Sequence, residues 1–363
     1  MLRRFATILS LCVCAALGAV HAQQLEWSVD FSSMFQNREG GDEQTPDQTI
    51  LFTRLAPEVG LSLMDNTHEI KGGVAWFQPM IDNGAGYKVL PTIYYNFHHG
   101  KWDVTTGMFP RSLLPLKPST LLWSDSLSFT TPNARGVLIR HQMPNCAMAL
   151  MVDWRQMQST TQREAFNVYF QALKHFYAPV TLLGEVQINH LAKRKDAPGG
   201  EGVNDDITLF PRIAVRAIRK PKAKLAIEVG PVVQLQRNRS EGKWHTPCRF
   251  FASANARLWS WLDIDQEFSI GKDAFPLYEQ FGSQLNLGDP YWRSKIYSRT
   301  DIKAHIVNNR FVDLNAGVTL HATDKTFGFW QQISCRFYID QDVWKHRRDK
   351  HYLNSRKLAG ELR

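Results

Sequence analysis

The sequence predicts an all-β protein, specifically a transmembrane antiparallel up-and-down β-barrel of about 16 strands. Three observations support this fold class: one strand that is apolar on one face and polar on the other, repetition of that pattern along the chain, and connections that alternate between short and long. Such strands, at a length of ~9–11 residues, are typical of membrane barrels.

The clearest strand is the run 327–339. Bulky apolar residues fall on one face, with Gln331 as the single polar exception, while Gln332, Ser334 and Arg336 lie in the middle of the other face. The period of two follows because successive side chains leave a strand on opposite faces. A soluble antiparallel sheet also alternates, so the prediction depends on the rest of the chain.

The chain begins with a segment typical of export. Arg3 and Arg4 precede an apolar core, and a small-residue cleavage pattern ends at Ala22, so we interpret residues 1–22 as a signal peptide. Lipidation of Cys12 or Cys14 is a weaker alternative. We therefore expect export to the bacterial outer membrane through a cleaved signal peptide.

The remaining composition argues against several classes of protein. The net charge of +9 is concentrated at the two ends, so residues 23–340 hold about +3 and no basic patch, and we expect no nucleic acid partner. Cys146, Cys248 and Cys335 are too widely spaced for a disulfide framework or a zinc site, and we expect no metal and no cofactor. No run of ~18 apolar residues follows the signal peptide, so an integral protein would have to be a closed barrel.

The pattern then repeats through residues 23–340. The expected first strand begins near Leu25 and the second covers 49–64, and later strands follow in the same phase. The expected short connections are 65–68, 98–101, 143–145, 177–179, 220–223, 259–261 and 308–310, and the expected long ones are 37–48, 81–89, 111–132, 155–163, 193–205, 237–245 and 272–293. A soluble β-sandwich has no reason to alternate loop lengths, whereas short periplasmic turns and longer external loops are typical of an outer-membrane barrel.

Sixteen strands would leave a water-filled lumen, so the inward-facing cations are the candidate pore-lining residues. These are Arg54, Arg140, Arg212, Arg216, Arg249, Arg257, Arg299, Lys303 and Arg336. One interpretation is a charged wall that sets ion selectivity, and the other is cross-strand ion pairing that stiffens the wall. The strands between the basic ones are acidic, so we favour pairing for most of them and expect Arg54 and Arg140 to be freer.

The expected loop 111–132 is unusually apolar for an external loop. Folding inward to narrow the lumen, covering the membrane surface as a flap, and forming a subunit contact are three alternatives that the sequence leaves open.

The residues on both sides of loop 111–132 resemble a known family of barrels. The order GMFPR (Gly107–Arg111), a long third loop, and Asn133–Val137 at the start of the sixth strand resembles the porins of the phosphate-selective O/P type. That resemblance implies sixteen strands, an inward third loop, a homotrimer and the passage of anions. The sequence differs in having Lys117 as the sole lysine between 111 and 132.

The C-terminal tail and the tryptophans near the strand ends are the last features with an expected role. Residues 341–363 are expected to form a basic periplasmic tail, for which contact with peptidoglycan or a periplasmic partner is one hypothesis. Seven tryptophans are assigned to the aromatic girdles of the barrel. They are Trp27, Trp76, Trp102, Trp154, Trp259, Trp261 and Trp330.

The function predicted from these features is a porin-like channel for passive diffusion of small hydrophilic solutes or ions. The expected partners are outer-membrane lipid and the assembly machinery that recognises the end of the last strand. No histidine lies in a recognisable catalytic motif, so the sequence alone predicts that the protein is not an enzyme. The alternatives are a barrel enzyme acting on lipid or glycan, and a closed structural or assembly component of the envelope.

Overall fold

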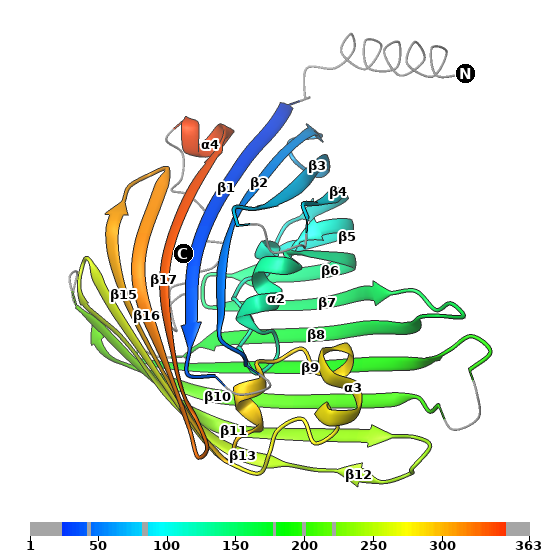
Figure 1. Ribbon diagram of the computed structural model, residues 1–363. Helices are drawn as coiled ribbons and strands as arrows, with labels where there is room; N and C mark the ends of the chain where they lie inside the picture. The colour runs from blue at the N-terminus through cyan, green and yellow to red at the C-terminus, as the bar shows by residue number, and fades with distance from the viewer. Residues whose placement is uncertain are drawn as a thin grey trace.

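The computed structural model describes residues 24–41, 45–81, 86–176, 179–197, 201–219 and 223–345. Long strands make up most of it, together with five short helical segments (Figure 1). The strands are β1 (Gln24–Glu39), β2 (Gln48–Leu63), β3 (His68–Pro79), β4 (Lys88–His99), β5 (Trp102–Pro110), β6 (Asn133–Met143), β7 (Cys146–Gln156), β8 (Arg163–His175), β9 (Val180–Arg194), β10 (Asn204–Arg219), β11 (Lys224–Asn238), β12 (Trp244–His245), β13 (Cys248–Trp259), β14 (Leu262–Gly271), β15 (Ile296–Asn308), β16 (Val312–Thr323) and β17 (Phe327–Asp340).

The strands form a closed antiparallel barrel. Each long strand pairs with its neighbours in the chain, and β1 pairs with both β2 and β17, so that Ser32 lies between Arg54 and Arg336. β12 is a two-residue strand in the loop after β11, which leaves sixteen strands in the wall. The predicted fold class is confirmed. Closure removes the free strand edges that would otherwise expose unpaired backbone groups.

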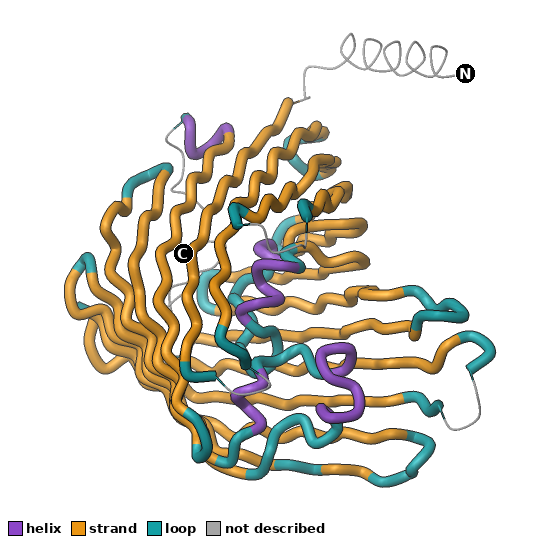
Figure 2. Tube along the Cα trace, in the orientation of Figure 1, coloured by secondary structure: helices purple, strands orange, loops and turns teal. Residues whose placement is uncertain are grey.

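The two ends of the barrel differ as the sequence predicts. Turns of a few residues join the strands at the end where β1 begins, and most of the connections at the opposite end are longer. Two of these fold back into the barrel, as the tube in Figure 2 shows. We name them the first inward loop (111–132), with η1 (Arg111–Leu113) and α2 (Asp125–Thr130), and the second inward loop (272–295), with α3 (Tyr278–Leu285) and η2 (Pro290–Arg293).

Part of the interior is packed with side chains and is not the water-filled lumen expected from the strand count. One buried cluster joins apolar side chains of the wall to Leu121, Leu122, Phe275 and Trp292 of the two inward loops. The wall residues come from strands as far apart as β4, β8, β11 and β17. The expectation failed because strand count fixes only the diameter of the wall, whereas the inward loops decide how much of the space is filled.

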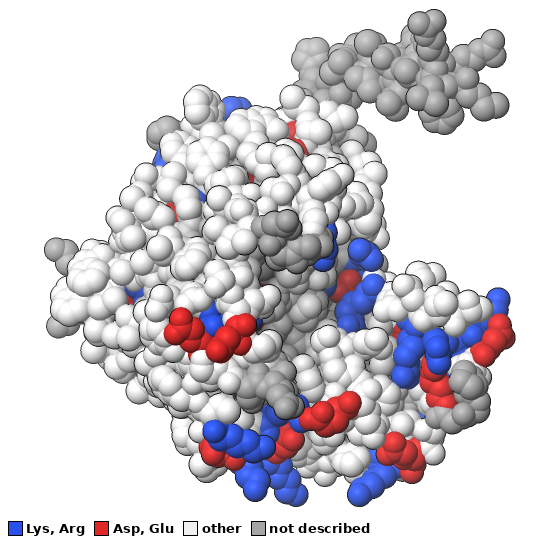
Figure 3. Space-filling view, viewed as in Figure 1, with Lys and Arg blue, Asp and Glu red and all other residues white. Residues whose placement is uncertain are grey.

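The outer wall is apolar, and charge gathers around the rim at the long-loop end (Figure 3). Trp76, Trp102 and Trp154 are exposed on that wall, as expected for an aromatic girdle. Trp330 is not, because it is 3% exposed and packs inside the barrel. Its position in the alternation of β17, opposite to Ile333, places it on the inward face.

The signal peptide and most of the basic tail lie outside the described residues. The start of the tail forms α4 (Gln341–Trp344), whose Gln341 Oε1 accepts a hydrogen bond of 3.0 Å from the backbone N–H of Trp27. The three described cysteines are free. No helix among the described residues is long and apolar enough to span a bilayer.

Candidate functional site

The first inward loop is fixed to the wall of β8 and β9 by inward-facing side chains. Gln171 accepts from the backbone N–H of Leu116 at 2.7 Å, and Glu185 accepts from that of Ser119 at 3.0 Å. These two hydrogen bonds replace the ones that the backbone N–H groups of the loop would make with water if the loop were exposed. Of the three alternatives that the sequence leaves open for loop 111–132, the structure shows folding into the barrel.

Each inward loop is also held at its base by an arginine. Arg111 forms a buried ion pair with Asp153, donates from Nε to the carbonyl of Thr131 at 3.2 Å, and lies 3.8 Å from the ring of Trp123. Arg249 donates to the carbonyl of Lys272 at 2.6 Å and to that of Lys295 at 3.4 Å. Arg249 therefore joins the two ends of the second inward loop and is not available to line a pore.

The two loops contact each other directly. The backbone N–H of Asp289 donates to the carbonyl of Thr120, and that of Ser124 to the carbonyl of Leu287, both at 2.8 Å. Gly288 is required at this crossing, because a Cβ atom there would overlap the carbonyl oxygen of Leu121. The loops therefore form a single plug rather than two independent flaps.

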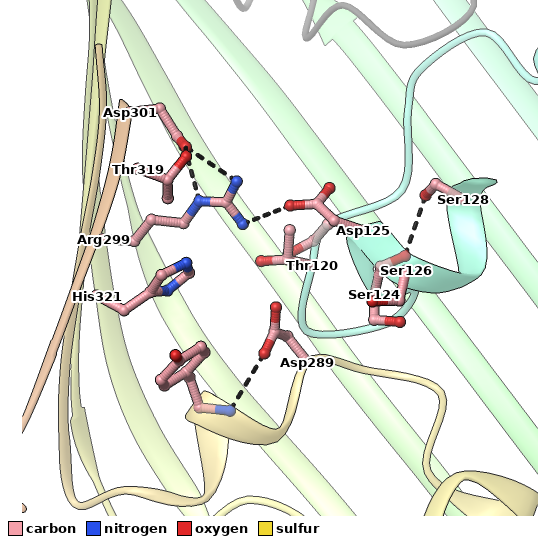
Figure 4. A network of polar contacts seen from close by, with 12 residues as sticks. Thr120, Ser124, Asp125, Ser126, Ser128, Asp289, Arg299, Asp301, Thr319 and His321 are labelled. Atoms are coloured by element: carbon pink, nitrogen blue, oxygen red, sulfur yellow. Dashed lines mark hydrogen bonds and ion pairs between the residues drawn. The ribbon is translucent and has the colours of Figure 1, made fainter. Parts of the chain in front are cut away.

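Arg299 of β15 is the centre of a polar network between this plug and the wall (Figure 4). Its Nη1 lies 2.7 Å from Asp125 Oδ2 of the first inward loop, and its Nε and Nη2 donate to Asp301 at 2.7 and 3.0 Å. Lys117 Nζ donates to the other oxygen of Asp125 at 2.8 Å. We call Asp125, Arg299 and Asp301 the loop latch.

Two carboxyl groups of the plug ionise differently in this environment. Burial raises the pKa of Asp125, but the charges of Arg299 and Lys117 outweigh burial and hold it well below its usual range. Burial raises the pKa of Asp289 to about 6, with the charge of Arg299 opposing and that of Asp125 adding to the rise. Asp289 thus changes its charge near neutral pH while Asp125 stays ionised.

His321 of β16 closes the network on its other side. Its ring stacks 4.1 Å from that of Tyr291, and its Nδ1 is 2.9 Å from the hydroxyl of Tyr297. Its Nε2 has no hydrogen-bond partner in the part of the chain that the structure describes. The side chain is fully buried, so it does not meet solvent as it stands.

All nine candidate pore-lining residues lie on inward faces of their strands, but six of them are paired with carboxylates. The pairs are Arg54–Asp30, Arg140–Asp103, Arg212–Glu185, Arg257–Asp263, Arg299–Asp125 and Arg336–Asp30. The expected cross-strand pairing is confirmed for five of these, whereas Arg299 pairs with Asp125 of the first inward loop and with Asp301 of its own strand. Arg54 and Arg140 are not freer than the rest, because strand register, which the sequence does not reveal, places Asp30 and Asp103 beside them.

Arg216 and Lys303 differ from the other candidates. Among the described residues neither of them forms an ion pair. They lie on β10 and β15, on the short-turn side of Arg212 and Arg299 respectively. They are the two inward cations of the predicted set that remain candidates for contact with a solute.

A polar cavity of about 60 Å³ separates the first inward loop from the wall of β9–β14. Lys117, Arg212, Glu228 and Glu267 contribute its charges, and Ser253 and Asn255 its neutral polar groups. At ~10–15 Å³ for each water, the cavity holds a few waters and no solute of appreciable size. Passage along this route would require the first inward loop to move.

Several residues of the site could not have been selected from the sequence. Asp125 and Asp289 carry no linear motif and lie far apart in the chain, and nothing in the sequence sets the candidate His321 apart from the other histidines. The second inward loop did carry a signal, since 272–295 is nearly as apolar as the first inward loop. No group of three or more potential metal-ligating side chains occurs in the described ranges.

Comparisons with known proteins agree with the fold. The chain is similar to OprD of Pseudomonas aeruginosa (TM-score 0.55, 5% identity, 88% of this chain and 96% of that chain) and to OccAB4 of Acinetobacter baumannii (TM-score 0.53, 8% identity, 88% and 99%). It is also similar to OccK1 of P. aeruginosa (TM-score 0.52, 9% identity, 87% and 99%). No curated protein matches the chain.

These neighbours show that the chain has the barrel fold of the porins. The porin likeness expected from the sequence is confirmed at that level, but the neighbours are of the OccK and OprD kind, and the phosphate-selective O/P type is not shown. The barrel fits the predicted outer-membrane location.

A family model adds a different finding. The Lipid A 3'-O-deacylase-type family matches residues 17–192, just under half of the chain. This match overturns the expectation that the protein is not an enzyme. The expectation rested on the lack of a linear motif, and a site that the fold assembles from separate strands needs none.

Proposed function

We propose that the protein is an outer-membrane channel for small hydrophilic solutes whose lumen is narrowed by the two inward loops. The observation that carries the proposal is the loop latch, which ties a plug inside a sixteen-stranded wall to the inner face of β15. In this orientation the short turns, α4 and the tail face the periplasm. The plug sets the resting conductance, and its displacement opens the route.

Single-channel recording from the refolded protein in a planar bilayer tests the channel. Stable open steps of low conductance are expected, because the described part of the lumen holds a packed core. Silence from a barrel shown to be folded would contradict the proposal. The outer-membrane location also requires cleavage of the signal peptide, which N-terminal sequencing tests. It requires delivery by the assembly machinery, which membrane fractionation tests.

The ion selectivity of the proposed channel would depend on the inward-facing arginine and lysine side chains that form no ion pair among the described residues. Phosphate selectivity of the O/P kind has little support, because Lys117, the sole lysine of the first inward loop, is engaged by Asp125. We propose instead a modest anion preference set by Arg216 and Lys303. The double substitution R216Q/K303Q should shift the reversal potential toward the value of a cation-selective channel. An unchanged reversal potential would show that these two residues do not set the ion preference.

The homotrimer that the sequence resemblance implies is tested by native mass spectrometry.

The second candidate function is hydrolysis of an acyl ester of a membrane lipid, which the family-model match over residues 17–192 favours. Within that range, His98 is the candidate for proton transfer, as a general acid. Its Nδ1 is hydrogen-bonded to Asp103, which orients the ring, and its Nε2 lies 3.8 Å from Glu69. Carboxylates at both ring nitrogens favour the protonated imidazole, which can donate a proton to the leaving alcohol but has no free nitrogen to accept one.

Release of fatty acid from purified lipid A by the reconstituted barrel tests this candidate. H98Q should lower the release by about a hundredfold or more, the usual contribution of a general acid. H175Q is the matched control, since His175 lies at the same end of β8 and contacts Thr181 instead of a carboxylate. Equal rates for wild type and H98Q would exclude His98, and no release by wild type would exclude the candidate.

A further inference from the structure

A row of side chains crosses six strands on the outer wall near the long-loop end. Direct cross-strand pairs link Trp154 to Phe166, Phe166 to His190, His190 to Asp205, Asp205 to Arg237 and Arg237 to Trp244. We name these six residues, with the adjacent Arg239, the rim row. It faces outward, because the residues next to it along the strands, such as Asn189 and Asp206, are the ones buried inside the barrel.

The centre of the rim row holds more positive than negative charge. Asp205 accepts from Arg237 Nη2 at 2.9 Å and from Arg239 Nε and Nη2 at 2.8 and 2.9 Å, and His190 Nδ1 is 3.3 Å away. One carboxylate thus faces two guanidinium groups, which leaves an excess of one positive charge. The side chain of Arg239 is 49% exposed, and Arg237 Nε has no hydrogen-bond partner among the described residues.

The surroundings of this charge fit the boundary of a membrane. Trp154 and Trp244 are each 42% exposed at the two ends of the row, and the guanidinium of Arg237 lies 4.3 Å from the ring of Trp244. Further along the strands the outward face becomes apolar, with Ile188 and Leu209 exposed. Aromatic rings at headgroup level above an apolar wall are typical of membrane barrels, and a cation there meets lipid phosphates rather than acyl chains.

We propose that the rim row is a binding site for the phosphate group of an anionic membrane lipid. Arg237 and Arg239 would hold the phosphate, while the acyl chains lie along Ile188 and Leu209. The ion pairs around Asp205 keep both guanidinium groups at one place on the rim. This site lies outside the lumen, so it requires neither the channel nor lipid hydrolysis.

The test is lipid binding by the full-length barrel in neutral detergent, titrated with dipalmitoyl phosphatidylglycerol and followed by native mass spectrometry. R239Q removes the excess positive charge and should weaken binding about fivefold, the usual effect of one basic residue at an anionic surface. D205N doubles the excess charge while its amide oxygen can still accept from a guanidinium group, so binding should strengthen by a similar factor. Phosphatidylcholine should bind equally to all variants.

R194Q is the matched control, because Arg194 lies at the same rim but is paired with Glu201. It should leave the affinity for phosphatidylglycerol unchanged. Equal affinity of wild type, R239Q and D205N would overturn the proposal. Displacement of phosphatidylglycerol by millimolar inorganic phosphate would overturn the assignment to a lipid and leave a site for free phosphate. Heat-modifiable migration of each variant verifies that the barrel has folded.

Discussion

At the scale of single residues, the inward loops are held against the wall by a few buried charges whose partners come from different parts of the chain. Arg299 is the clearest case, since Asp301 lies two residues away on the same strand while Asp125 comes from the first inward loop. The sequence identified Arg299 as an inward cation with acidic neighbours. It could not identify Asp125, because a contact between a loop and a distant strand leaves no periodic pattern.

Asp289 leads to a prediction about pH. Its pKa is raised to about 6 in the folded plug, above the value expected for an unfolded chain. A raised pKa stabilises the plug at low pH, and that stabilisation is lost as pH rises through 6. The plug should therefore be more stable at pH 5 than at pH 8 by about 1–2 kcal/mol. Asp125, whose pKa is lowered, contributes no change in this window.

Hydrogen exchange of the amides of 119–124 and 285–289, corrected for intrinsic rates, measures this difference. D289N should abolish the pH dependence and keep the low-pH protection at pH 8, because an asparagine oxygen can still accept from the backbone N–H of Tyr291. Protection that is independent of pH in the wild type would show that Asp289 does not titrate in this range.

At the scale of elements, the strands were predictable and the inward loops only partly. Alternation fixes which residues of a strand face the lumen, and it places Trp330 inside even though its residue type suggested the membrane surface. The apolar composition of the first inward loop indicated a packed loop but not its direction. That direction depends on Gln171 and Glu185, whose significance appears only when β8 and β9 are paired.

Gly288 tests whether the two inward loops act as one unit. G288A should force the loops apart at Leu121 and destabilise the plug by roughly 1–3 kcal/mol, the usual cost of overpacking. Faster hydrogen exchange should appear in both inward loops at once. G184A is the control, because nothing lies within 4 Å of a Cβ atom at that position. Faster exchange in the second inward loop alone would show that the loops move independently.

At the scale of the whole molecule, the number of strands and the closure of the barrel were foreseen, and the filled interior was not. Periodicity is a local property and accumulates over sixteen strands into a reliable fold class. The contents of the lumen depend on long-range packing between loops and wall. The deacylase-type match points to a site that the sequence alone did not reveal. His98 and Asp103 become a candidate pair only when β4 and β5 are paired across the turn between them.

Single-channel conductance of R299M, recorded beside that of the wild type, tests whether the loop latch holds the plug in the lumen. The substitution breaks the contact between the first inward loop and β15 and leaves Asp125 paired with Lys117 of its own loop, so the plug should detach and the conductance should rise severalfold. R257Q, which removes an inward arginine paired with Asp263 away from both loops, should keep the wild-type conductance. Equal conductance of R299M and wild type, with both barrels folded, would contradict the claim that the loop latch controls passage.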